Sequence, residues 1–126
     1  MDIDDLTARY TAAWNSGDPA QVASFFAPGG SIVINVDGIS TGRDEIAEMA
    51  KGFHTAVPDL ELTRDGFRSA GAHVLSMWTF TGHDADTGNR LSVSGWEEWD
   101  LNDAGQVQAS RGWFDAQDYA RQVAGD

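Results

Sequence analysis

The sequence predicts an α+β fold, in which a curved antiparallel sheet wraps around three helices from the N-terminal half of the chain. Two patterns carry this prediction. Up to Val57 the hydrophobic residues recur at three- and four-residue steps, which is typical of helices, and after Pro58 they alternate in long runs, which is typical of strands. Short links join those runs. We expect antiparallel pairing, because a parallel crossover needs about a dozen residues or more.

Two helices are expected within the first 27 residues. The first is indicated by a stripe of apolar residues on one helical face: Ile3, Leu6, Tyr10 and Trp14. The second begins at Asp18-Pro19, which places an N-cap before a proline at the first helical position. We expect it to run through Phe26 and to stop at Pro28-Gly29-Gly30.

A small hairpin and a third helix complete the N-terminal half. Asp37-Gly38 suits a tight reversal between β-branched residues, and the third helix is expected from Gly42 to the stop at Pro58. Four long strands then form a meander: Leu60–Phe67, Ala72–Thr81, Leu91–Leu101 and Val107–Phe114. A brief helix ends the chain. Three short helices cannot fill the concave side of such a sheet, so a funnel-shaped pocket is expected there.

Composition narrows the classes of partner. The 126 residues suffice for a single domain, residues 1–126, and carry a formal net charge of −12. Such a charge repels nucleic acids and anionic membrane surfaces, and no stretch is long and apolar enough to span a bilayer. The chain has no cysteine, and its three histidines are isolated, so no metal site is expected. We expect a cytoplasmic protein that binds a small molecule.

Four segments resemble one known family: ARYTAAWNSGDPAQVASFFAPGGSIVI, GRDEIAEM, VPDLEL and GWFDAQDYARQ. Together they are similar to the SnoaL-like polyketide cyclases of the nuclear transport factor 2-like superfamily. The resemblance implies a cone-shaped α+β barrel with a central pocket, a homodimer, a hydrophobic small-molecule substrate, and catalysis without metal or cofactor.

The resemblance also implies a catalytic residue. The buried aspartate that serves these cyclases as general acid/base corresponds to Asp115, with His83 or Arg111 adjusting its proton affinity. A second interpretation of Asp115 stays open, because aspartate is also a preferred N-cap and a helix is expected to start there. A steroid isomerase of the usual design is disfavoured, since its base would fall at Ile34.

The aromatic residues are the candidates for binding substrate. Trp96 and Trp99 have opposite parity on one expected strand, so one of them is expected on the outer sheet face, where it would suit a dimer interface. The residues expected to contact substrate are Tyr10, Trp14, Phe53, His54, Trp78, Trp96 and Trp113.

The function predicted from these patterns is a cofactor-independent cyclase or isomerase that acts by general acid/base catalysis on a hydrophobic, polyketide-like carbonyl compound. Two alternatives stay open. One is an epoxide hydrolase or epoxide-opening cyclase of the same superfamily, and the other is a non-catalytic module for binding a small molecule or for dimerisation.

Overall fold

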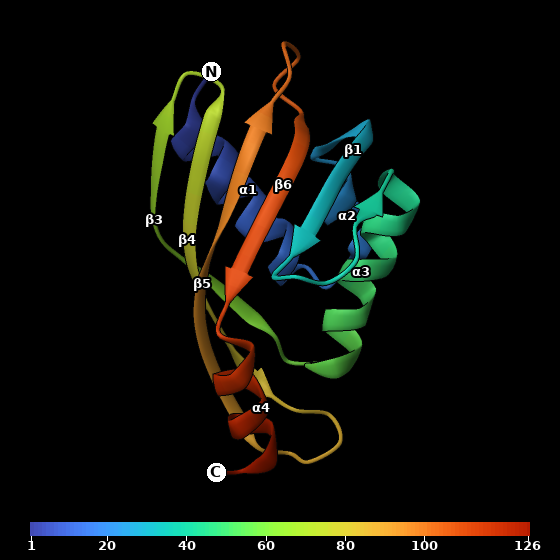
Figure 1. The fold of residues 1–126 in the computed structure, drawn as a ribbon, viewed down its shortest axis with the longest axis vertical. Helices are drawn as coiled ribbons and strands as arrows, with labels where there is room; N and C mark the ends of the chain where they lie inside the picture. Colours follow the sequence, from blue (N-terminus) through green and yellow to red (C-terminus); the bar gives the residue numbers. More distant parts are fainter.

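Four helices and six strands follow one another along the chain (Figure 1). The computed structural model describes residues 1–126. In chain order the elements are α1 (Ile3–Asn15), α2 (Pro19–Ala23), β1 (Phe26–Ile34), β2 (Ser40–Thr41), α3 (Arg43–Ala56), β3 (Glu61–Ala70), β4 (His73–His83), β5 (Arg90–Leu101), β6 (Val107–Phe114) and α4 (Ala116–Ala124).

All six strands belong to one curved, unclosed sheet in the order β2-β1-β6-β5-β4-β3. The predicted meander is confirmed, since β3, β4, β5 and β6 pair in turn as antiparallel neighbours. The hairpin is also present, with β1 and the two-residue β2 antiparallel. The structure also contains a parallel pair that the sequence did not predict: β1 lies beside β6, the last strand of the chain.

The prediction for the second helix was wrong at its C-terminal end. Helix α2 ends at Ala23, and Pro28-Gly29-Gly30 lies inside β1. The pairing of β1 with β6 is interrupted between Phe26 and Ser31, and proline is tolerated in such an irregularity because no ladder hydrogen bond is required of it. Glycine is required at position 30, where a Cβ would lie 2.7 Å from the carbonyl oxygen of Val107. Sheet pairing, which local sequence does not reveal, decides the conformation here.

The predicted helix boundaries at Asp18 and Pro58 agree with the structure. The Asp18 side chain accepts a hydrogen bond from the backbone N–H of Ala20 at 3.0 Å, with Pro19 at the first helical position. Helix α3 ends at Ala56, just before Pro58, because proline restricts the preceding residue and cannot continue a helix.

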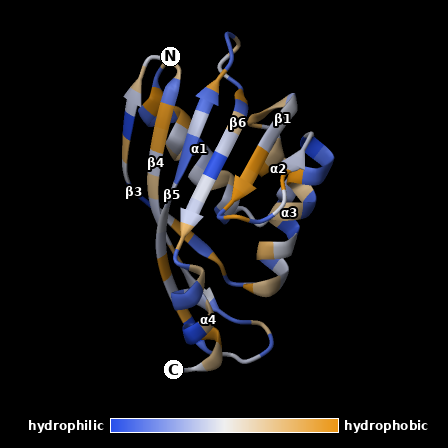
Figure 2. Ribbon diagram, viewed as in Figure 1, coloured by the Kyte–Doolittle hydropathy of each residue, from blue (hydrophilic) through white to orange (hydrophobic).

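The helices of the N-terminal half pack on the concave face of the sheet. Helix α1 crosses behind the strands, α3 lies beside the β1 edge, and α4 lies at the far end near β5 (Figure 1). Hydrophobic residues run along β1 and β4 (Figure 2). The main core cluster joins α1 to the sheet, and its Trp99 side chain is fully buried. A smaller cluster lies around Phe80, and the space between the two clusters becomes the site described below.

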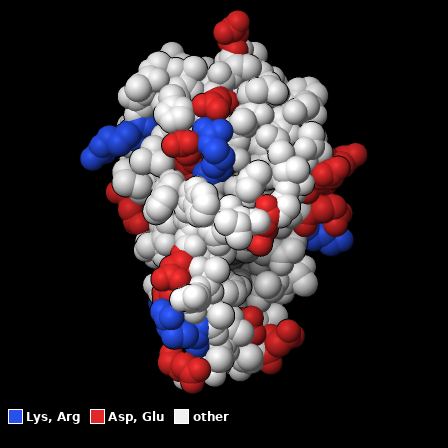
Figure 3. Space-filling model, in the orientation of Figure 1, with Lys and Arg blue, Asp and Glu red and all other residues white.

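Acidic side chains are distributed over the visible surface rather than gathered at one place (Figure 3). They outnumber the basic residues by 20 to 8, which leaves a negative field around the whole molecule. None of the helices combines the length with the apolar character that crossing a lipid bilayer would require.

Candidate functional site

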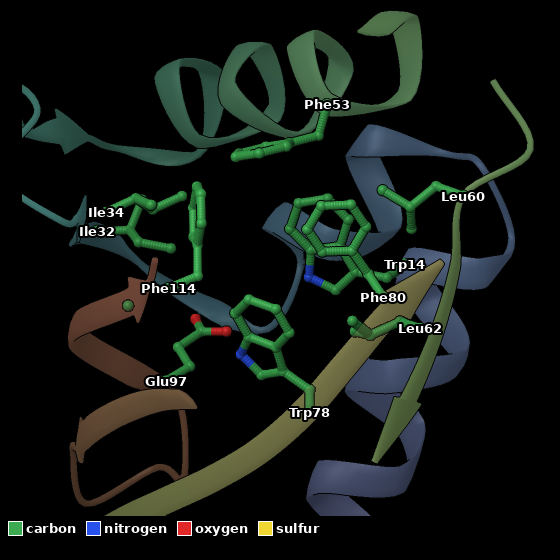
Figure 4. Close-up of a pocket in the computed structure, with 11 residues that line it drawn as sticks. Trp14, Ile32, Ile34, Phe53, Leu60, Leu62, Trp78, Phe80, Glu97 and Phe114 are labelled. Atoms are coloured by element: carbon green, nitrogen blue, oxygen red, sulfur yellow. The ribbon is translucent and has the colours of Figure 1, made fainter. Parts of the chain in front are cut away.

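A cavity of about 60 Å³ lies between the helices and the concave face of the sheet. This volume is several times what one water molecule needs, so the cavity is more than a packing defect. Nine of its eleven lining residues are hydrophobic. The lining residues are Trp14, Ile32, Ile34, Phe53, Leu60, Leu62, Trp78, Phe80, Glu97, Gly112 and Phe114 (Figure 4).

The alternation of the strands explains why these residues face the cavity. Successive side chains on a strand point to opposite faces, so Glu97 and Trp99 face the helices whereas Trp96 faces outward. On β6 the same rule turns Gly112 and Phe114 toward the cavity. The carboxylate of Glu97 therefore projects among aromatic rings (Figure 4).

Two asparagine side chains hold wall strands in place. Asn15, at the end of α1, accepts a hydrogen bond from the backbone N–H of Leu62 at 2.6 Å and donates one to its carbonyl oxygen at 2.9 Å. Asn35, which has a φ of 56°, accepts a hydrogen bond from the backbone N–H of Phe114 at 2.9 Å. Both asparagines thereby fix a strand that contributes to the cavity wall.

Glu97 is the only ionisable side chain among the lining residues, and it is 7% exposed. Its Oε1 atom accepts two hydrogen bonds, from the Tyr10 hydroxyl at 3.0 Å and from the Ser110 hydroxyl at 2.6 Å. No hydrogen bond within the protein involves its Oε2 atom. One oxygen is thus held by the protein, and the other remains available for a ligand.

Burial raises the pKa of Glu97, because the charged carboxylate loses its hydration. The hydroxyls of Ser110 and Tyr10 and the nearby indole of Trp99 oppose this shift by favouring the charged form. The Trp99 N–H itself lies outside hydrogen-bond geometry. Burial and then the charge of Glu97 raise the pKa of Tyr10, so its hydroxyl keeps its proton and remains a donor. Burial in the cavity thus raises the pKa of this carboxyl group above its ordinary value.

Asp115 lies outside the cavity. It is exposed and serves as the N-cap of α4, where its Oδ1 atom accepts hydrogen bonds from the backbone N–H groups of Gln117 and Asp118, both at 3.0 Å. The expected position of Asp115 in an apolar hollow is therefore not what the structure shows, because strand β6 ends at Phe114 and the chain turns into the helix. The geometry supports the capping interpretation.

Asp115→Ala should lower the free energy of unfolding by about 1 kcal/mol, because two N–H groups of α4 lose their acceptor. Asp115→Asn should leave it nearly unchanged, since asparagine caps helices as well as aspartate does. Urea denaturation of both variants measures the difference. Unchanged stability of Asp115→Ala would contradict the capping role.

His83 and Arg111 also lie away from the cavity and from each other. The ring Nδ1 of His83 lies 2.7 Å from a carboxylate oxygen of Asp59, and both side chains are about half exposed. Arg111 is on the outer sheet face, where its Nε donates to Glu98 at 2.8 Å and its Nη1 to Asp100 at 3.1 Å. The three residues expected to act together are therefore in three separate places.

The expected substrate-binding residues divide into three groups. Trp14, Phe53 and Trp78 line the cavity. Tyr10 does not line the cavity, but its hydroxyl donates a hydrogen bond to Glu97, which does.

His54 and two tryptophans do not line the cavity. The ring Nε2 of His54 lies 2.9 Å from the carbonyl oxygen of Trp14. Trp96 and Trp113 pair across β5 and β6 on the outer face, 45% and 41% exposed. The expectation that these two contact substrate placed them on the wrong face, although the opposite parity of Trp96 and Trp99 already indicated that one of them faces outward.

Sequence reasoning missed Glu97 as the acidic residue of the site. A signal was present, because Glu97 occupies an inward position between Val93 and Trp99 in the alternation of its strand. A carboxylate at such a position is rarely buried without partners. Those partners, Tyr10 and Ser110, are far away in sequence and become neighbours only through the register of the sheet. No cluster of three or more histidine or acidic side chains is arranged to hold a metal ion.

The chain has a ketosteroid isomerase-like α+β fold with a mostly apolar pocket. A protein of this fold from Catenulispora acidiphila DSM 44928, solved in complex with trimethylamine, superimposes with a TM-score of 0.86 at 18% identity, covering 94% of this chain and 91% of its own. A protein from Jannaschia sp. CCS1 described as a SnoaL-like polyketide cyclase gives 0.78 at 17% identity over 90% and 87%.

The particular family follows from the sequence. The family model of the SnoaL-like domain matches residues 7–109, and the chain belongs to this family. A further structural relative is SalBIII, an epoxide hydrolase/cyclase-like enzyme in pyran ring formation in the polyether salinomycin, with a TM-score of 0.80 at 16% identity over 91% of this chain and 92% of its own. No protein with a curated description matches the sequence significantly.

Proposed function

We propose that this protein is a cofactor-independent cyclase or isomerase in which Glu97 is the general acid/base. The observation that carries the proposal is the placement of one buried carboxyl, with one unpartnered oxygen, in an otherwise apolar cavity. Such a site favours a hydrophobic substrate with one carbonyl group near Glu97, because the Glu97 carboxyl is the one polar side chain that the cavity offers for a hydrogen bond. A pKa raised by burial is also what proton transfer near neutral pH requires.

The proposed reaction conserves its proton. As a carboxylate, Glu97 removes a proton from the carbon next to a carbonyl group and leaves an enolate. The enolate carbon then bonds to a second carbonyl carbon of the same molecule, whose oxygen becomes an alkoxide and takes the proton back from Glu97. In an isomerisation the proton returns to carbon instead. Tyr10 and Ser110 hold Oε1 throughout, so that Oε2 exchanges the proton.

Proton exchange tests this chemistry without the natural substrate. In deuterium oxide the protein should accelerate the exchange of the protons beside the carbonyl group of small aromatic ketones such as acetophenone, followed by NMR. Exchange no faster than in buffer, with acetophenone bound, would contradict the assignment.

The structure offers less to the epoxide-opening alternative. That reaction pairs an acid with an arginine and a second carboxylate, whereas Arg111 and its partners Glu98 and Asp100 are on the outer face of the sheet. Glu97 is the only ionisable side chain that lines the cavity.

A second candidate is the binding of a small organic cation. Five aromatic side chains line the cavity together with Glu97, and the Catenulispora protein was solved with trimethylamine. Aromatic faces and a carboxylate attract alkylammonium groups. The two candidates differ in the sign of their pH dependence: a ketone accepts a hydrogen bond from neutral Glu97 and should bind more tightly as the pH falls, whereas trimethylammonium needs the carboxylate and should bind more tightly as the pH rises.

The outer sheet face supports a proposed homodimer. Trp96 and Trp113 lie side by side there and are both substantially exposed, which is unusual for tryptophans without a partner surface. Trp96→Glu should convert a dimer to a monomer in sedimentation experiments, because it would bury an unpaired charge at the interface. Lys51→Glu, an exposed change on α3, is the control. A wild-type chain that sediments as a monomer would refute the dimer.

A further inference from the structure

Gly112 is the cavity residue directly opposite Glu97. The two are register partners on β5 and β6, and both line the cavity. On the inward face of β6, Gly112 lies between Ser110, which bonds the Glu97 carboxyl, and Phe114, which forms a wall. Along this face the strand therefore presents a hydroxyl group, then a position without a side chain, and then an aromatic ring.

The local backbone does not require glycine at this position. Gly112 does not have a positive φ, and a Cβ there would meet nothing closer than 3.7 Å, the Cγ1 atom of Ile34. Gly95 is different, because a Cβ there would lie 2.2 Å from the carbonyl oxygen of Trp113 and 2.8 Å from the ring of Trp78. Packing thus explains Gly95, and it does not explain Gly112.

Glycine inside a strand weakens the strand, and where packing does not require it, it often marks a place where a ligand approaches the backbone closely. At Gly112 the missing side chain leaves space next to the only carboxyl of the cavity. The open space lies between Ile34 on one neighbouring strand and Glu97 on the other. Glu97 has one oxygen without a protein partner, so the space adjoins a polar group that can take a ligand.

We propose that Gly112 is the specificity-determining residue of this site, because it keeps open a bay beside Glu97 for the carbonyl-bearing end of the substrate. The proposal rests on the function proposed above and adds a size limit to it. The ligand class is a small apolar ketone whose carbonyl group is at the edge of the molecule. A methyl ketone on an aromatic ring meets this description, since its ring would lie against the aromatic walls.

The test compares graded side chains at this position. Gly112→Ala and Gly112→Val should fold, because the backbone at position 112 does not have a positive φ and because valine is favoured in strands. Binding of cyclohexanone, acetophenone and acetylnaphthalene is measured by the fluorescence of the lining tryptophans and by NMR. We expect Gly112→Ala to weaken acetylnaphthalene binding by about tenfold or more and cyclohexanone binding less, and Gly112→Val to exclude all three.

The matched control is Gly29→Ala, also a strand glycine, exposed and with nothing within 4 Å of its added Cβ. It should bind all three ketones as the wild type does. Equal weakening of large and small ketones by Gly112→Ala would indicate a merely structural effect and overturn the proposal, as would unchanged binding in Gly112→Val or a wild type that binds none of the ketones.

The outcome separates this proposal from the proposed function. If Glu97→Gln loses proton exchange while the Gly112 variants bind every ketone normally, the bay is refuted and the acid/base role stands. If the Gly112 variants discriminate by size while Glu97→Gln exchanges protons at the wild-type rate, the bay stands and the acid/base role is refuted.

Discussion

Glu97→Gln should slow the exchange of protons beside a ketone carbonyl by about 10²–10⁴-fold, the range that general acid/base catalysis supplies. Glutamine has nearly the same size and keeps an oxygen that accepts the hydrogen bonds of Tyr10 and Ser110, so the cavity should keep its shape. It cannot take up or release the proton. Ketone binding should persist, which separates a loss of chemistry from a loss of the site.

The matched control is Glu98→Gln, one residue further along β5. Glu98 faces outward and is bonded by Arg111, so its change removes a carboxylate of the same strand without altering the cavity. Exchange should remain at the wild-type rate in this variant. Equal losses in both variants would point to a general effect on the sheet and would contradict the role of Glu97.

Glu97→Gln should also change how the free energy of unfolding depends on pH. The folded-state pKa of Glu97 is raised above its ordinary value of 4.5, so the folded chain holds this proton more tightly than the unfolded chain does. The stability that the proton contributes is complete below pH 4.5 and is lost as the pH rises through the raised pKa. Glu97→Gln lacks this loss, so its stability relative to wild type should increase across that interval, as urea denaturation at successive pH values would reveal.

Trp99→Ala should cost about 3–5 kcal/mol of unfolding free energy, which is the usual cost of removing a fully buried large side chain. The Trp99 ring packs edge-on against Tyr10, with ring centroids 4.8 Å apart, and therefore joins α1 to the sheet. Loss of the Trp99 ring would also remove the packing that positions Tyr10, whose hydroxyl donates a hydrogen bond to Glu97. We expect a large drop in the denaturation midpoint and, in the fraction still folded, weaker ketone binding.

Trp96→Ala is the corresponding control on the outer face. The same residue type is removed from the same strand, yet the change should be within about 0.5 kcal/mol where the chain is monomeric, because that side chain is 45% exposed. A similar cost for both tryptophans would contradict the assignment of the two sheet faces.

Local patterns predicted most of the secondary structure, because alternation and helical periodicity are properties of neighbouring residues. The strand Val107–Phe114 and the cap at Asp18 are examples. The same patterns did not predict that Phe26 begins a strand, since its partner Val107 is far along the chain. Local sequence can place a residue on a face of an element, and only pairing between elements decides which faces meet.

The candidate site shows this limit clearly. Trp14, Phe53 and Trp78 were expected to contact substrate, and all three line the cavity. Asp115 was favoured through a resemblance of motif, and the structure places it at a helix cap. Glu97 was recognisable as an inward carboxylate, but its hydrogen bond to Tyr10 spans 87 positions of sequence and depends on the packing of α1 against β5.

The position of β6 has a consequence for synthesis of the chain. This strand is made after every other strand, yet it is inserted between β1 and β5 and contributes Ser110, Gly112 and Phe114 around the carboxyl. Until β6 leaves the ribosome, β1 is paired only with the two-residue strand β2, and Glu97 lacks the hydrogen bond from Ser110. The nascent protein therefore carries a partial sheet with open edges and no finished pocket, and both are completed in one late, long-range step of folding.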